Sequence, residues 1–312
     1  MRIFIAGASG ALGKPLVRQL AAAGHEVTGM TRTPEKAAAL RELGAEPVVA
    51  DALDAAAVMT AVRAARPEVV VHQLTAIGPL NMRNFDAGFV ATNRLRTEGT
   101  DNLVAAARAA GARRFVGQSF APWSYKREGG PVKAEDAPLE TDPPKHVEET
   151  LAAIRHLEAA ITGADGLEGI VLRYGGFYGP GTSIARGGDM LEPIVKGRFP
   201  VVGDGGGVWS LIHIEDAAAA TVAAIERGRP GVYNVADDEP APVREWLPVL
   251  AEAVGGRRPR HMPGFLGRLL LGPAGYAMMT SIRGASNAKA KRELAWAPAW
   301  ESWRRGFREG LG

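Results

Sequence analysis

Three glycines recur at intervals of three residues near the start of the chain, in the run Gly7-Ala8-Ser9-Gly10-Ala11-Leu12-Gly13. The run follows an apolar segment at 2–6 and opens an alanine-rich segment at 12–23. The first glycine permits a tight turn, the second lets a phosphate approach the backbone, and the third lets a helix pack close to the strand. Amide groups at the start of that helix carry partial positive charge. The pattern predicts a dinucleotide-binding turn formed by Gly7, Ser9, Gly10, Ala11, Leu12 and Gly13.

The residues after the second apolar segment bear on which dinucleotide is bound. An acidic residue at this place binds the ribose hydroxyls of NAD. Here the segment reads Thr31-Arg32-Thr33-Pro34-Glu35-Lys36, with no acid at its first two positions. A guanidinium binds a 2′-phosphate through two parallel hydrogen bonds, and a lysine at the start of the next helix adds positive charge. The sequence therefore favours NADP over NAD, with contacts from Thr31, Arg32 and Lys36.

The elements that must hold this turn alternate along the first half of the chain. Short apolar segments are separated by helical ones, and this alternation is typical of parallel β-α-β units. Uninterrupted apolar runs such as Val69-Val70-Val71 fit strands that are buried on both faces. The predicted fold is an α/β doubly wound parallel sheet of the Rossmann type. Strands are expected at 2–6, 26–30, 46–50, 68–73, 113–118, 169–173 and 231–234, and helices at 12–23, 34–43, 54–64, 85–110, 147–162 and 215–227.

This alternation breaks down in the second half of the chain. Glycine and proline become frequent between 178 and 207, and later helical patterns occur at 243–254, 263–279 and 285–294 without strands between them. We expect a dinucleotide-binding domain at 1–177, to which 205–238 returns. A smaller C-terminal substrate lobe is expected from 178–204 and 239–303.

Composition excludes several classes of protein and site. The chain has 312 residues, a formal net charge of +3 and no cysteine, which excludes disulfides and thiolate chemistry. Its densest basic stretch, Arg257-Arg258-Pro259-Arg260, has no interleaved aromatic residue, so no nucleic-acid partner is expected. No apolar run approaches the roughly 20 residues of a membrane helix. No cluster of histidines and carboxylates has metal-ligand spacing. We expect a cytoplasmic protein with a small-molecule substrate, no membrane partner and no metal.

Further motifs follow in order along the chain, and together with the glycine turn they resemble one family. They are Asp51-Ala52-Leu53-Asp54, His72-Gln73-Leu74-Thr75-Ala76, Gly99-Thr100-Asp101-Asn102-Leu103, Arg173-Tyr174-Gly175-Gly176-Phe177-Tyr178-Gly179-Pro180-Gly181 and His213-Ile214-Glu215-Asp216-Ala217. The sequence resembles the NAD-dependent epimerase/dehydratase family, the extended short-chain dehydrogenases/reductases, over nearly the whole chain. The resemblance implies the Rossmann fold, a nicotinamide cofactor and, by analogy, a possible homodimer. It also implies cofactor contacts at Asp51, Ala52, Leu53, Leu74, Thr75, Ala76, Asn93, Gln118, Tyr174, Gly176 and Phe177.

The resemblance fails at the residues that carry the family's chemistry. The family uses a serine or threonine and a Tyr-x-x-x-Lys pair, whose lysine lowers the pKa of the tyrosine and holds the nicotinamide ribose. None of the five tyrosines here is followed by lysine four residues later. Alignment on Glu158 places Thr150 and Ile154, or after a shift of one Leu151 and Arg155, at the two positions. The catalytic residues are therefore expected to be non-standard, with Ser119 and Tyr125 as candidates.

The substrate lobe is mildly apolar and aromatic, which favours a small, partly apolar carbonyl or alcohol as substrate. We expect an NAD(P)-dependent oxidoreductase. Two alternatives stay open: an epimerase or dehydratase that uses the cofactor transiently, and a non-catalytic NADP-binding sensor or scaffold. The predicted substrate contacts are Phe120, Trp123, Tyr178, Arg186, Trp209 and Met279.

Overall fold

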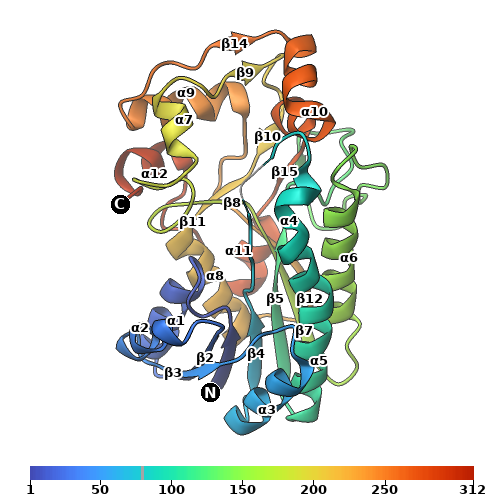
Figure 1. The fold of residues 1–312 in the computed structure, drawn as a ribbon, viewed down its shortest axis with the longest axis vertical. Helices are drawn as coiled ribbons and strands as arrows, with labels where there is room; N and C mark the ends of the chain where they lie inside the picture. The colour runs from blue at the N-terminus through green and yellow to red at the C-terminus, as the bar shows by residue number, and fades with distance from the viewer. Residues whose placement is uncertain (79–80) are drawn as a thin grey trace.

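A computed structural model of the chain describes residues 1–78 and 81–312 and contains a seven-stranded parallel sheet (Figure 1). Its order is β12-β7-β5-β4-β1-β2-β3, so the direction of strand addition reverses between β1 and β4. The predicted α/β doubly wound sheet is confirmed. Ligands of such sheets bind at the carboxyl ends of the strands, at the point of this reversal. The strands are β1 (Arg2–Ala6), β2 (Glu26–Thr31), β3 (Ala45–Val49), β4 (Val69–His72), β5 (Arg114–Phe120), β7 (Glu168–Tyr174) and β12 (Gly231–Val235).

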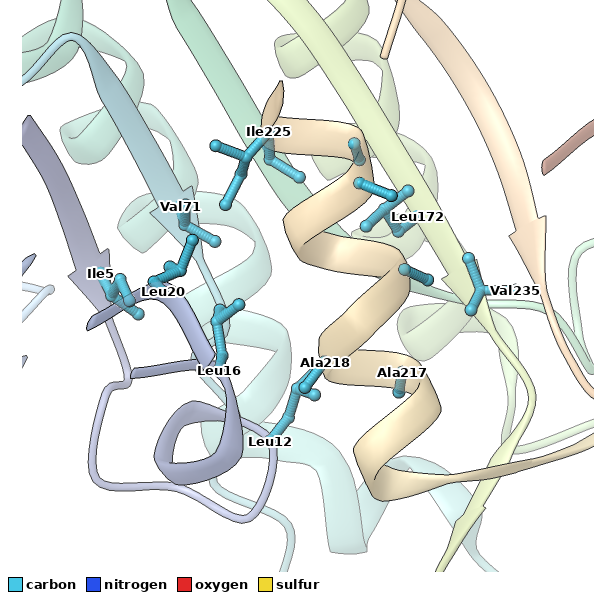
Figure 2. Packing of buried hydrophobic residues seen from close by; sticks show 14 of the residues in the cluster. Ile5, Leu12, Leu16, Leu20, Val71, Leu172, Ala217, Ala218, Ile225 and Val235 are labelled. Carbon is cyan, nitrogen blue, oxygen red and sulfur yellow. The ribbon is translucent and has the colours of Figure 1, made fainter. Parts of the chain in front are cut away.

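Helices cover both faces of the sheet because its strands present apolar side chains on each side. On one face, Ile5 and Val71 pack against Leu16 of α1 (Gly13–Ala22) and against α8 (Ile214–Arg227), as Figure 2 shows. On the other face, Phe4 and Val70 pack against α3 (Ala55–Ala65), α5 (Thr100–Ala109) and α6 (Glu148–Thr162). The remaining helices of this half are the 3₁₀ turn η1 (Pro34–Lys36), α2 (Ala37–Glu42), α4 (Phe85–Arg94) and α11 (Ala288–Leu294).

The long helix predicted at 85–110 is divided by a π-helical turn, η2 (Leu95–Gly99), between α4 and α5. Backbone hydrogen bonds in such a turn run from residue i to residue i+5, and single π-helical turns are frequent at functional sites. The carbonyl oxygen of Leu95 lies 3.3 Å from Nε2 of His72 at the end of β4, and the Thr100 hydroxyl also donates to it at 3.4 Å. The π-helical turn therefore faces the carboxyl end of the sheet.

A second group of elements gathers beyond the carboxyl ends of the strands, at the top of Figure 1. Its core joins Trp246 of α9, Met279 of α10 and Trp303 of α12 to Phe85 of α4 and Tyr178 of β8. The sequence pattern indicated α9 and α10 but not α12 or the short paired strands. The helices are α7 (Leu191–Val195), α9 (Val243–Ala253), α10 (Gly264–Thr280) and α12 (Trp303–Glu309). The strands are β6 (Val132–Lys133), β8 (Gly176–Tyr178), β9 (Val201–Val202), β10 (Val208–Trp209), β11 (Leu211–His213), β13 (Ala241–Pro242), β14 (His261–Met262) and β15 (Gly284–Ala285).

Within the described part of the chain, none of the helices combines the length and apolar character that a membrane crossing requires.

Candidate active site

The glycine turn leaves no room for side chains at two of its three glycines. A Cβ atom at Gly7, whose φ is +92°, would lie 2.7 Å from the carbonyl oxygen of Gln73. One at Gly13 would lie 2.2 Å from the carbonyl oxygen of Gly7. Gly10 is exposed, and its amide donates to the Gly7 carbonyl oxygen at 3.0 Å. The turn therefore packs tightly against β4 and presents bare backbone at Gly10 to the start of α1, which fits a pyrophosphate.

On the β2 and β3 side of this turn, two hydroxyls fasten it to the sheet. The Ser9 and Thr31 hydroxyl oxygens are 3.1 Å apart, and the Thr31 hydroxyl also accepts from the Thr33 amide at 3.2 Å. Both Arg32 and Lys36 are exposed just beyond the end of β2. The Thr31 hydroxyl thus has structural partners, while the two cations face solvent where the adenosine half of a dinucleotide would lie.

The predicted adenine segment at 51–53 forms a local turn after β3. The Asp51 carboxylate accepts from the Leu53 amide at 3.0 Å, and Asn102 of α5 donates to the Ala52 carbonyl oxygen at 2.9 Å. Asp51 is exposed and Ala52 is buried. The contact from Asn102 holds this segment against the helix layer.

On the β4 side of the turn, polar side chains cluster at the end of the strand. Thr92 of α4 accepts from the Ala76 amide at 3.0 Å and holds the segment 74–76 in place. Burial lowers the pKa of His72 to about 4, so the ring is neutral near pH 7, and its Nδ1 accepts from the Leu74 amide. Gln73 is 5% exposed; within the described residues its side-chain oxygen and nitrogen make no hydrogen bond of normal geometry, although the Tyr174 hydroxyl lies close enough for Gln73 to influence its pKa. An unpartnered buried amide at this place fits a site that a polar ligand completes.

The positions of the missing tyrosine and lysine lie on α6, beside α4. Thr150 is fully buried, and its hydroxyl accepts from Nδ2 of Asn93 at 3.2 Å. Its backbone amide donates to the Asp86 carboxylate at 2.8 Å. One turn later Ile154 is buried and apolar. Neither position of this α6 alignment supplies a phenol or an ammonium group.

Ser119 and Tyr125, the candidate catalytic residues, belong to one buried polar network. Ser119 donates to the Glu158 carboxylate at 2.6 Å, and Arg173 donates to both oxygens of that carboxylate at 2.6 and 2.8 Å. Arg173 also donates to the Tyr125 hydroxyl at 3.1 Å, and that hydroxyl donates to the Asn234 side-chain oxygen at 2.6 Å. The Tyr125 side chain is 2% exposed, and burial raises its pKa. Both hydroxyls have protein partners, so their catalytic role stays a prediction.

The predicted substrate contacts divide by burial. Phe120, at the end of β5, and the cofactor candidate Phe177, in β8, are partly exposed, whereas Arg186 is on the surface. The ring of Tyr178 packs edge-on against His213 and Phe307. The Tyr174 hydroxyl lies 2.6 Å from that of Thr221, inside the core. The other three candidates, Trp123, Trp209 and Met279, are all more than nine-tenths buried.

Arg96 is the residue at this site that the sequence pattern did not single out. It follows Asn93 by three residues, which places the two side chains on one face of the helix. Its guanidinium donates to the Asn93 side-chain oxygen at 3.3 Å and lies 5.6 Å from the centre of the Phe89 ring. The sequence feature that could have revealed Arg96 is its position three residues after Asn93, a predicted cofactor contact.

Comparison with known proteins identifies the family. The chain matches the NAD dependent epimerase/dehydratase family over residues 3–236. It belongs to this family. A 3-diazoavenalumate denitrifying reductase from Streptomyces sp is 47% identical, with 100% of this chain and 99% of that protein aligned. A 2-alkyl-3-oxoalkanoate reductase from Stenotrophomonas maltophilia (strain K279a) is 31% identical, with 83% and 77% aligned.

Among solved structures, the Thermus thermophilus UDP-glucose 4-epimerase in complex with NAD superposes with a TM-score of 0.74 at 25% identity, covering 100% of this chain and 98% of that one. Membership of the epimerase/dehydratase family supports a nicotinamide dinucleotide as the ligand of the glycine turn. The reductases among its relatives support an NAD(P)-dependent oxidoreductase. The residues present fit this cofactor, since the turn excludes side chains at Gly7 and Gly13.

Proposed function

We propose that the protein is an NADPH-dependent reductase that replaces the diazo group of a carboxylate substrate by hydrogen and releases N₂. One observation carries the proposal: the 47% identity to the 3-diazoavenalumate denitrifying reductase extends over the full length of both chains. The name of that relative describes a diazo-bearing carboxylate whose reduction is accompanied by loss of nitrogen. The predicted substrate lobe at 178–204 and 239–303 would cover such a substrate.

This reaction does not require the Tyr-x-x-x-Lys pair that the chain lacks. When bound, the reduced nicotinamide supplies a hydride whose electron pair forms the new C–H bond, while the C–N bond pair leaves with N₂. The step balances when the substrate reacts as a cationic arene diazonium: the hydride and Ar–N₂⁺ give Ar–H and N₂. No proton is consumed, and no oxyanion forms that a tyrosine must protonate. The α6 positions Thr150 and Ile154 carry no acid, and the Tyr125 phenol is held by Arg173 and Asn234.

For this reaction the chain has to hold two ligands next to each other and keep water away from them. The bare backbone at Gly10 would let the pyrophosphate approach the start of α1, whose first amides would bind it. The side chains of Phe120 at the end of β5 and Phe177 in β8 are partly exposed and apolar, which suits the exclusion of water from the reacting carbon. Orientation of the two reactants then supplies a large part of the rate enhancement.

Carbonyl reduction is the second candidate, favoured by the 31% identity to a 2-alkyl-3-oxoalkanoate reductase. It requires a proton for the developing alkoxide. Ser119 or Tyr125 would have to leave the network around Glu158 to supply it. A 2-alkyl-3-oxo acid therefore serves as the comparison substrate.

The experiment uses NADPH that carries deuterium at the transferred position of C4, together with an arene diazonium carboxylate. We expect release of N₂, oxidation of an equal amount of NADPH, and deuterium at the carbon that carried nitrogen. A reaction without protein and one with ordinary NADPH in heavy water are the controls. Product without deuterium, or faster turnover of the 2-alkyl-3-oxo acid, would contradict the proposal.

The preference for NADP is tested at Arg32. Replacing Arg32 by alanine removes the side chain proposed to bind the 2′-phosphate, and losing a charge-assisted pair of hydrogen bonds costs a factor of about ten. We expect the Kd for NADPH to rise by that factor and the Kd for NADH to stay within about twofold. Arg41→Ala is the matched control, because it removes an exposed cation of α2 that is not among the proposed contacts of the 2′-phosphate. Equal changes for both cofactors, or tighter binding of NADH by the unaltered protein, would reject NADP.

A further inference from the structure

The guanidinium of Arg96 is buried without a carboxylate. The residue is 7% exposed, and burial lowers its pKa to about 10. Within residues 1–78 and 81–312, its one hydrogen bond is the 3.3 Å contact with Asn93, and no carboxylate oxygen lies within 4.0 Å. A buried cation is costly unless hydrogen-bond acceptors surround it. In the described residues the other four N–H groups of this guanidinium have no protein acceptor, and its Nε and Nη2 atoms are not fully enclosed, so a ligand can reach them.

The surroundings of Arg96 place it over the end of β4. Asn93 bonds to Thr150 of α6, and Thr92 holds the backbone of the segment after β4. The π-helical turn that contains Arg96 touches β4 itself, because the Leu95 carbonyl oxygen meets the ring of His72. The charge of Arg96 also acts on His72 and contributes to its lowered pKa. Arg96 therefore lies between the carboxyl end of β4 and the first turns of α6.

A dinucleotide bound at the glycine turn must pass this place. The pyrophosphate lies over the turn after β1, and the adenosine half extends over β2 and β3, where Thr31 and Asp51 stand. The nicotinamide half therefore extends in the opposite direction, over β4. Its ribose, the group next to the pyrophosphate, meets the end of that strand first. Two neighbouring ribose hydroxyls offer paired acceptors that match the planar donors of a guanidinium.

We propose that Arg96 binds the 2′- and 3′-hydroxyls of the nicotinamide ribose, as a positioning residue of the cofactor site. Helices α4 and α5 run beside α6 in the same direction, because Asn93 of α4 meets Thr150 and Asp101 of α5 meets His156 at 2.8 Å. One turn after Thr150, α6 carries the apolar Ile154 at the expected lysine position. One turn after Asn93, the neighbouring helix carries Arg96. In the alignment that places Ile154 at the lysine position, the π-helical turn thus supplies a cation; in the alternative alignment, that position holds Arg155 of α6.

The test measures binding, with no need for turnover, and is independent of the substrate proposed above. Wild-type protein and Arg96→Met are titrated with NADPH and with adenosine 2′,5′-bisphosphate, which has the adenine half and the 2′-phosphate but no nicotinamide ribose. We expect the Kd for NADPH to rise about tenfold in Arg96→Met, as for the loss of a charge-assisted contact. The Kd for the bisphosphate should stay within about twofold. Arg96→Lys should recover part of the affinity for NADPH, because the charge is retained without the planar donors.

Two controls distinguish cofactor binding by Arg96 from a purely structural role of this residue. Arg94→Met alters an exposed arginine of the same helix, paired with Glu98, and should change neither Kd. Without ligand, Arg96→Met should melt at or above the wild-type temperature, because it removes an unpaired buried charge. The assignment is wrong if Arg96→Met binds NADPH with the wild-type Kd, whatever its melting temperature. It is also wrong if the Kd values for NADPH and for the bisphosphate rise equally.

Discussion

Replacing Glu158 by alanine is expected to lower the free energy of unfolding by about 3–5 kcal/mol, the cost of removing one partner of a buried ion pair. The carboxylate accepts two hydrogen bonds from Arg173 and one from Ser119. Arg173 is 3% exposed, so its charge would stay in the core without a counter-charge. The Tyr125 hydroxyl would lose the fixed position of the guanidinium that donates to it. Urea-induced unfolding, followed by far-ultraviolet circular dichroism, measures the change.

Two further variants test this explanation. Glu98→Ala removes the exposed ion pair with Arg94 and should leave the unfolding midpoint unchanged within error, because exposed pairs contribute little. The double variant Glu158→Ala/Arg173→Met should recover part of the lost stability, because the uncompensated charge is also removed. If the double variant instead has a lower free energy of unfolding than Glu158→Ala, the uncompensated charge of Arg173 is not the cause of the lost stability.

Replacing Gly10 by valine is expected to weaken NADPH binding by a factor of about 100 or more, with little change in folding. Gly10 is exposed and has no positive φ, and an added Cβ would lie 3.2 Å from the Gly7 carbonyl oxygen. The rest of the valine side chain would occupy the space above the start of α1 where the pyrophosphate comes close to the backbone. Fluorescence titration with NADPH measures the Kd, and the melting temperature without ligand reports on folding.

The matched control is Gly130→Val. Gly130 is also exposed without a positive φ, and an added Cβ would meet nothing within 4 Å. It should bind NADPH with the wild-type Kd. Binding by Gly10→Val that equals this control would show that the dinucleotide does not lie over the glycine turn.

The glycine turn and the sheet could be predicted because their determinants are local. Gly7, Gly10 and Gly13 lie within one turn and the first residue of a helix, and each strand of the sheet is a short apolar run of its own. Predicted strands agree with the observed ones to within two residues at each end. The helix at 85–110 was placed correctly but not its π-helical turn, whose Leu95 carbonyl oxygen contacts His72 of another element, a contact that no local pattern reveals.

The candidate catalytic residues show where local reasoning ends. Ser119 and Tyr125 follow the strand predicted at 113–118, and a polar residue at a strand end is a reasonable candidate for chemistry. Their actual partners, Glu158 and Arg173, stand 39 and 48 residues away along the chain. No spacing rule connects groups at such distances, because the sheet and α6 bring them together only after folding.

The sequence by itself determined that a nicotinamide dinucleotide is expected at the first turn and that the Tyr-x-x-x-Lys pair is missing. Both are statements about residues close together in the chain. Only the tertiary structure decided that Arg96 is buried beside that site and that Glu158 pairs with Arg173. Burial and ion pairing depend on which elements pack together, and the free energy of a charge depends on whether water or protein surrounds it.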